Sequence, residues 1–328
     1  MRLCVSLGLC LFTFSVSAKI DLVQIEKDLS GTGITGWVHG AVHDSKMYVF
    51  TFRDPADFFS HAEFSLVPRN QAVRELLEKA VRHDEVQIQG LFLANPSPQK
   101  HILVTSLKVI APYTPGGPAL PARHSSINLA DDLKGKTSLL ATVHAVAGDG
   151  AVLVIEYKDT VVPVFVEEVA LTRDLYRGDK IRVHFVFASH PKNPSHLQLN
   201  PAVKPAVEVL EKIVEQDGKP LTLEGPLVYF PKSPQLRFGV FALQTVDSNG
   251  LKLNHTLVNF EDPDAFNAIR KKLDALWKAN EKTAVDGRNC WVNPKVRIRA
   301  EGIGNVSSPS QANPQILLES ADSVNAVP

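Results

Sequence analysis

Apolar and polar positions alternate through three stretches of the chain that lie about 100 residues apart, a spacing typical of one domain. Each stretch contains two β-branched apolar residues separated by one polar residue. The apolar positions are Val86 and Ile88, Ile181 and Val183, and Val296 and Ile298; the polar positions between them are Gln87, Arg182 and Arg297. A period of two predicts β-strands with one buried and one exposed face. We expect the apolar set to be buried and the polar set not to be.

A turn and a second apolar strand follow each of these stretches. The segments 92–104, "FLANPSPQKHILV", and 187–199, "FASHPKNPSHLQL", align without a gap, and in the third copy the turn "NVSSPSQANP" is longer. Three strand-like segments precede each hairpin. Helical spacing then appears in 70–81 and 262–279 of the first and third copies, and the second copy has a short helical segment, "EVALTRDLY". The chain therefore repeats one domain three times.

Three strands, a helix and two strands is the element order of the oligonucleotide/oligosaccharide-binding (OB) fold, which each copy resembles. The resemblance covers most of the chain but rests on element order, without a family-specific motif. It implies an all-β protein with short helices, built as three tandem OB-like five-stranded barrels. The alternative is another small antiparallel barrel or sandwich, repeated three times.

Composition and pattern divide the chain into segments. Proline and glycine interrupt the segment after the first hairpin, whereas helical spacing of Val207, Leu210 and Val214 predicts a connecting helix before the third copy. The expected divisions are a signal peptide at 1–18, a first OB-like domain at 19–110, a Pro/Gly-rich linker at 111–136, a second domain at 137–202, a connecting helix or linker at 203–220 and a third domain at 221–328.

The first residues differ in kind from the rest. A basic start, an uncharged apolar run and the small-residue pattern "SVSA" predict a secretory signal cleaved after Ala18, with an uncleaved anchor as the alternative. The protein is then expected to be secreted or periplasmic. Cleavage would leave Cys290 as the sole cysteine, so no internal disulfide is expected, and beside Trp291 we expect it to be a small buried hydrophobe.

The sequence contains no recognisable catalytic or metal-binding pattern. Its histidines are scattered, and no nucleophile elbow, phosphate loop or dinucleotide fingerprint follows a strand. We expect no enzyme activity, no cofactor and no metal; a hydrolase whose site is assembled between barrels remains an alternative. The formal net charge is zero, so no long-range field attracts nucleic acid.

Binding is the favoured class of function, because an OB barrel offers a groove across its second and third strands, framed by two loops. Tyr48, Phe50 and Phe52 are expected to point into the first barrel. The candidate ligand-binding residues are Trp37, His39, Lys100, His101, Arg182, His184, Lys192, His196, Lys295, Arg297 and Arg299.

The predicted partner is a protein or a polysaccharide, bound by a secreted or periplasmic adaptor. Binding of single-stranded nucleic acid is the disfavoured alternative. It would depend on the basic stripe Lys295, Arg297 and Arg299, with help from Arg182, and would be weak and sensitive to salt.

Overall fold

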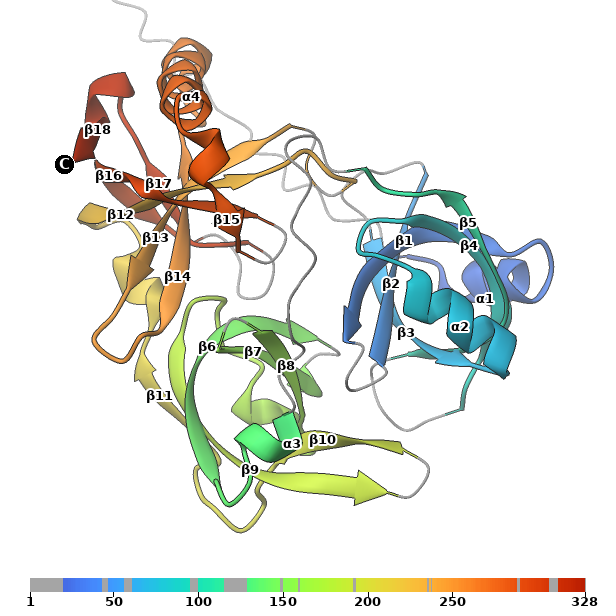
Figure 1. The fold of residues 1–328 in the computed structure, drawn as a ribbon. Coiled ribbons are helices and arrows are strands. Elements are labelled where there is room, and N and C mark those ends of the chain that lie inside the picture. The colour runs from blue at the N-terminus through green and yellow to red at the C-terminus, as the bar shows by residue number, and fades with distance from the viewer. Residues whose placement is uncertain are drawn as a thin grey trace, which may run out of the picture.

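The computed structural model shows three β-barrels in succession, coloured blue, green and orange to red along the chain in Figure 1. It describes residues 20–42, 47–55, 61–94, 100–114, 129–147, 150–158, 160–190, 193–234, 236, 238–287, 290–306 and 312–327. The predicted signal segment and most of the Pro/Gly-rich linker lie outside the described residues.

The first barrel is a closed ring of five strands in the order β1-β2-β3-β5-β4. Its elements are α1 (Leu22–Ser30), β1 (Ile34–Val42), β2 (Met47–Arg53), β3 (His61–Pro68), α2 (Gln71–Lys79), β4 (Glu85–Phe92) and β5 (His101–Ala111). The helix α2 lies between the third and fourth strands, as the OB resemblance implies, and the Asn70 side chain accepts a hydrogen bond from Val73 N to cap it.

The second barrel repeats this plan and adds a sixth strand. Its elements are α3 (Leu129–Asp132), β6 (Ser138–Ala147), β7 (Val152–Tyr157), β8 (Thr160–Phe165), the 3₁₀ turn η2 (Val169–Leu171), β9 (Lys180–His190), β10 (Asn193–Leu199) and β11 (Val207–Glu211). Pairing of β10 with both β8 and β9 closes the ring, and β11 extends the sheet beyond β9.

The third barrel closes through the long strand β16, which pairs with both β12 and β17. Its elements are η3 (Ile213–Gln216), β12 (Pro220–Phe230), β13 (Val240–Val246), β14 (Lys252–Val258), α4 (Pro263–Lys278), η4 (Glu281–Thr283), β15 (Val285–Asp286), β16 (Trp291–Asn305), β17 (Gln315–Leu317), η5 (Ala321–Ser323) and β18 (Val324–Val327). The protein is thus mostly strand, with three OB-like domains.

The predicted alternation of buried and exposed residues is confirmed along β4, β9 and β16. The six residues predicted to be buried are at most 4% exposed, while Gln87 and Arg182 are half-buried and Arg297 is exposed. Each barrel has its own apolar core. Tyr48 and Phe50 are buried in the first core and Phe52 packs against it, so this aromatic strand face does point inward. Cys290 is buried, as expected.

A buried acidic or amide side chain stands at the start of the fourth strand in every barrel. Asp84, Asp179 and Asn293 are at most 5% exposed. The Asp84 carboxylate accepts hydrogen bonds from Val81 N at 2.9 Å and from Tyr113 N at 2.8 Å, so it ties the turn before β4 to the chain that leaves β5. Asp179 accepts the equivalent pair of bonds in the second barrel.

The prediction of a connecting helix within 203–220 is wrong. The chain there forms β11, paired antiparallel with β9 from Val207 opposite Val183, and then the short turn η3. Valines at 207 and 209, both β-branched, suit a strand better than a helix, and pairing with the open edge of β9 decides between the two patterns. The second-barrel segment predicted to be helical forms only a 3₁₀ turn.

Candidate nucleic-acid interface

Trp37 of the first barrel lies beneath an arginine that also contacts the third barrel. The Arg53 guanidinium carbon lies 5.0 Å from the centre of the Trp37 ring, and Arg53 Nη1 donates a hydrogen bond to Pro234 O of the third barrel at 2.7 Å. Trp37, a predicted binding residue, is half-buried, and Arg53 covers its ring. This tryptophan is therefore part of a contact region between barrels rather than an open stacking surface.

Histidines occupy the same place on the first and second barrels. His39 Nδ1 lies 3.3 Å from Glu63 Oε1, and His144 Nδ1 lies 2.8 Å from Glu156 Oε1. Burial, with a smaller contribution from Arg82, holds the pKa of His39 well below its usual value. Burial likewise lowers the pKa of His144 to about 4. Both rings are thus neutral at pH 7 and offer no positive charge to a phosphate.

The predicted binding residues of the second barrel have an acidic partner on β11. Arg182 Nη1 lies 2.7 Å from Glu208 Oε2, and His184 Nε2 lies 3.1 Å from Glu208 Oε1. These two contacts hold the sixth strand against β9 and lower the pKa of Glu208. The charge of Arg182 is therefore compensated within the sheet.

The hairpin-loop candidates are only partly described. Lys100 is exposed at the start of β5, where its carbonyl accepts a hydrogen bond from Ser65 N at 3.0 Å, and His101 follows it in β5. His196 belongs to β10, and Lys192 lies outside the described residues. Their role in binding stays a prediction.

The predicted basic stripe on β16 is exposed. Lys295, Arg297 and Arg299 alternate with buried residues along the strand. Lys295 and Arg297 have no ion-pair partner in the described part of the chain, whereas Arg299 Nε lies 3.1 Å from Glu301 Oε1. Glu224 of β12 stands opposite Arg299 and adds a second acid.

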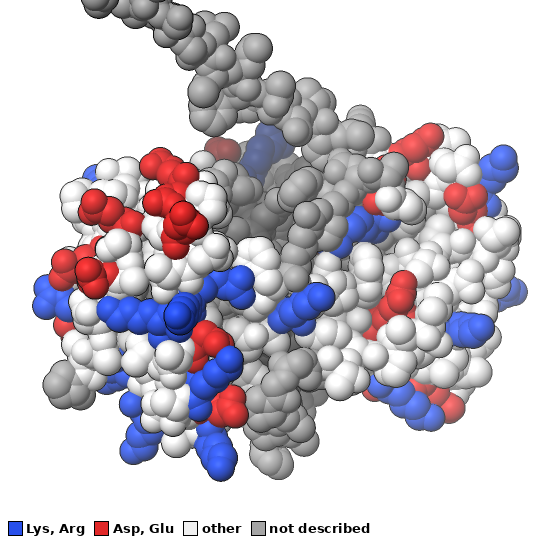
Figure 2. All heavy atoms as spheres, turned by 90° about the horizontal axis from the view of Figure 1, so that it is seen from above, with Lys and Arg blue, Asp and Glu red and all other residues white. Residues whose placement is uncertain are grey.

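The stripe continues across β18 to the helix. Asn325 pairs with Arg299 across β16 and β18, and Lys272 Nζ of α4 donates to Asn325 Oδ1 at 3.2 Å. We call Lys295, Arg297, Arg299 and Lys272 the basic row. Figure 2 shows Lys and Arg side chains beside acidic ones on the domain at the left. Positive charge on this side of the molecule is therefore confined to small areas.

Sequence reasoning missed Lys272, together with an aromatic cluster on the other side of α4. Phe238, in the loop between β12 and β13, is 45% exposed, and the Arg270 guanidinium carbon lies 4.8 Å from the centre of its ring. Phe266 completes the cluster at 5.6 Å from Arg270. The only signal in the sequence was an aromatic beside a basic residue, "LRFG", within a loop that borders the OB groove.

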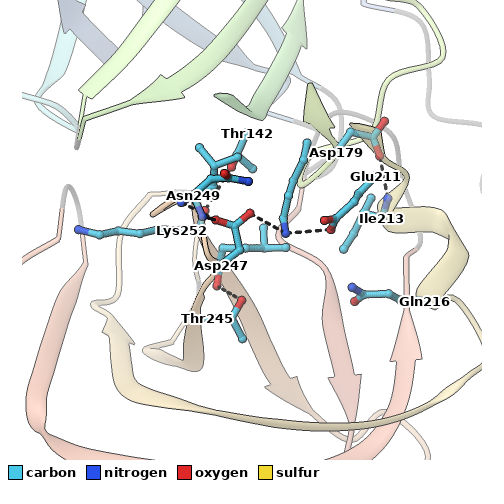
Figure 3. Close-up of polar contacts among 12 residues, drawn as sticks. Thr142, Asp179, Glu211, Ile213, Gln216, Thr245, Asp247, Asn249 and Lys252 are labelled. Atoms are coloured by element: carbon cyan, nitrogen blue, oxygen red, sulfur yellow. Dashed lines mark hydrogen bonds and ion pairs between the residues drawn. The ribbon is translucent and has the colours of Figure 1, made fainter. Parts of the chain in front are cut away.

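A lysine fixes the second barrel to the third (Figure 3). Lys180 Nζ lies 2.8 Å from Glu211 of β11 and 2.9 Å from Asp247 in the turn before β14. Burial works to lower the pKa of Lys180, but the two carboxylates outweigh it and raise the pKa. Thr142 of β6 reaches Lys252 O at 3.5 Å beside it. These contacts hold the basic row in a set position relative to the second barrel.

Among the described residues, no group of three or more His, Cys, Asp or Glu side chains could hold a metal ion. No helix in that part of the chain has the length and apolar character needed to cross a bilayer. A search against protein-family models finds no match, and no curated protein matches significantly.

Three of the solved structures that are similar to this chain cover different shares of it. A murine DNA-binding protein bound to double-stranded DNA is 14% identical, over 53% of this chain and 90% of that one, with a TM-score of 0.18. A Drosophila Unr structure described as CSD456 is 10% identical, over 90% and 97%, with a TM-score of 0.16. A replication protein A heterotrimer bound to single-stranded DNA is 9% identical, over 90% and 92%, with a TM-score of 0.16. At these identities the likeness concerns the fold alone.

These findings correct the main functional prediction. Two of the similar structures are described with bound DNA, which contradicts the predictions of a protein or polysaccharide partner and of a secreted or periplasmic location. Net charge was given too much weight in the ranking of partners, because a total of zero averages over the whole surface, whereas the basic stripe lies on one strand of one barrel.

Proposed function

We propose that the protein is a non-enzymatic binder of single-stranded nucleic acid, and that its third barrel supplies the main phosphate contacts. The observation that carries the proposal is the contrast between two strands at equivalent positions. On β9, Lys180 and Arg182 are both paired with carboxylates, whereas on β16 Lys295 and Arg297 are exposed without such a partner in the described residues.

The spacing of the basic row suits a phosphate chain. Alternate residues on one face of a strand stand about 7 Å apart, close to the separation of successive phosphates in an extended single strand. Lysine and arginine side chains that neutralise phosphates release counterions, so affinity falls steeply with salt. Because Glu224 and Glu301 lie beside Arg299, we expect the binding to be weak. Because the contacts are to phosphates, we expect it not to depend on base sequence.

The test compares the native chain with the variant Lys295→Gln/Arg297→Gln, which removes the two cations that have no ion-pair partner in the described residues. Fluorescence anisotropy of a labelled oligonucleotide, measured across a salt series, gives the slope of log K against log salt. Each phosphate contact to a single strand contributes about 0.7 to that slope, so losing two contacts should make it shallower by about 1.4 and weaken binding at low salt.

The matched control is Lys108→Gln/Arg173→Gln, which removes the same charge from exposed positions on the first and second barrels. It should leave the slope close to that of the native chain. Equal effects of the two double variants would show that charge acts through the whole molecule and that β16 is not the contact surface.

A further inference from the structure

Two side chains of the first barrel donate hydrogen bonds to the loop between β12 and β13, which carries the exposed Phe238. Tyr113 Oη of the first barrel donates to Lys232 O at 2.6 Å, and Arg53 Nη1 donates to Pro234 O at 2.7 Å. Ser233 and Leu236 bond to each other across the loop. The described residues of this loop are therefore bonded both to the first barrel and to each other.

Arg270 packs against the ring of Phe238, which, unlike the half-buried Trp37, is still 45% exposed. Its guanidinium lies against Phe238 and Phe266, whose ring centres are 5.9 Å apart, and Arg270 Nη2 reaches Gly239 O at 3.4 Å. Behind this group, Tyr229 packs so closely on Gly239 that a Cβ there would lie 2.3 Å from the Tyr229 hydroxyl. Tyr229 in turn packs against the core of the third barrel, so the cluster is continuous with that core.

We propose that Phe238, held by Arg270 and Phe266, is a stacking platform for one unpaired base of a bound single strand. The inference rests on the proposed function and specifies where a base, rather than a phosphate, is held. An aromatic ring fixed in advance loses little entropy when a base stacks on it, and every base has a π face, so such a platform adds affinity without sequence preference.

The charges around the platform favour this occupant. Arg270 is within the cluster and Lys271, next to it on α4, is exposed, so this part of α4 carries two cations that a neighbouring phosphate could reach. Asp274 lies one turn further along α4, and its carboxylate is 2.7 Å from Lys278 Nζ. This ion pair reduces the repulsion between Asp274 and the phosphates of a bound nucleic acid. The loop between the first two strands also borders the binding groove of OB barrels.

The experiment uses the full chain and two labelled oligonucleotides of equal length, one of thymidines and one abasic, which keeps the phosphates but has no bases. Phe238→Ala should bind the thymidine oligonucleotide roughly tenfold more weakly and the abasic one unchanged, with the salt slope preserved. Phe238→Trp should restore binding, whereas Phe238→Leu, which keeps the bulk, should not. Phe260→Ala is the matched control, because Phe260 is 67% exposed in the loop before α4.

The outcomes separate the two proposals. If the native chain binds neither oligonucleotide, the proposed function fails and this inference fails with it. If the native chain binds but Phe238→Ala binds thymidine normally, or loses the abasic oligonucleotide equally, only the stacking platform is overturned. The second of these results would show that the substitution disturbs the phosphate contacts or the fold.

Discussion

Replacing Asp179 with alanine should lower the free energy of unfolding by about 3 kcal/mol, because two buried N–H groups would lose their acceptor. Asp179 is fully buried, and its carboxylate accepts hydrogen bonds from Tyr176 N at 2.9 Å and from Ile213 N at 2.8 Å. Lys212 Nζ, 3.6 Å away, compensates its charge. The second of these bonds also joins the second barrel to the segment that leads into the third.

Chemical denaturation followed by circular dichroism measures this loss. The control is Asp174→Ala, an exposed aspartate five residues earlier, which should change the free energy of unfolding by less than about 0.5 kcal/mol. An equally small effect of Asp179→Ala would mean that water replaces the carboxylate and that the buried aspartate is not a structural tie.

Acidification from pH 7 to pH 5 should destabilise the third barrel by about 2 kcal/mol through His255 alone. His255 is 2% exposed, and burial lowers its pKa to about 4. In the unfolded chain the pKa is near 6.5, so the unfolded state binds the proton first. The stability that the neutral ring provides is complete above pH 6.5 and is lost as the pH falls from 6.5 towards 4.

The variant His255→Gln isolates this contribution, because glutamine can keep the contact with Gln216 Oε1, which lies 3.2 Å from His255 Nε2. The native chain should lose about 2 kcal/mol more than the variant between pH 7 and pH 5 in denaturation experiments. Thr256→Gln, on the adjacent outward position of β14, should behave like the native chain. Parallel pH profiles for the native chain and His255→Gln would contradict the account.

The sequence predicted the barrels because their determinants are local. Alternation such as Val86–Gln87–Ile88 depends only on which strand face is buried, and the helical stripe of α4 depends only on its own spacing. The segment around Val207 was misread because its fate depends on a distant partner, the free edge of β9. The helix α1 was not predicted; only two of its nine residues, Ile25 and Leu29, are buried.

The candidate site was predicted only in part, for a related reason. Exposure of Lys295, Arg297 and Arg299 follows from alternation along β16. Alternation does not reveal whether an exposed basic residue has an acidic partner. Glu208 pairs with Arg182 only because β11 lies beside β9. Arg270 and Phe238 are far apart in the sequence and meet only when α4 packs next to the loop that precedes β13.

The central claim is that this chain binds single-stranded nucleic acid, and equilibrium binding of the native protein to a labelled oligonucleotide of about 30 nucleotides tests it directly. That length can span more than one OB barrel. We predict a dissociation constant of roughly 10⁻⁴ to 10⁻⁶ M at physiological salt, tightening steeply as salt is lowered. No binding at about 50 mM salt with protein above about 100 μM, or affinity independent of salt, would contradict the claim.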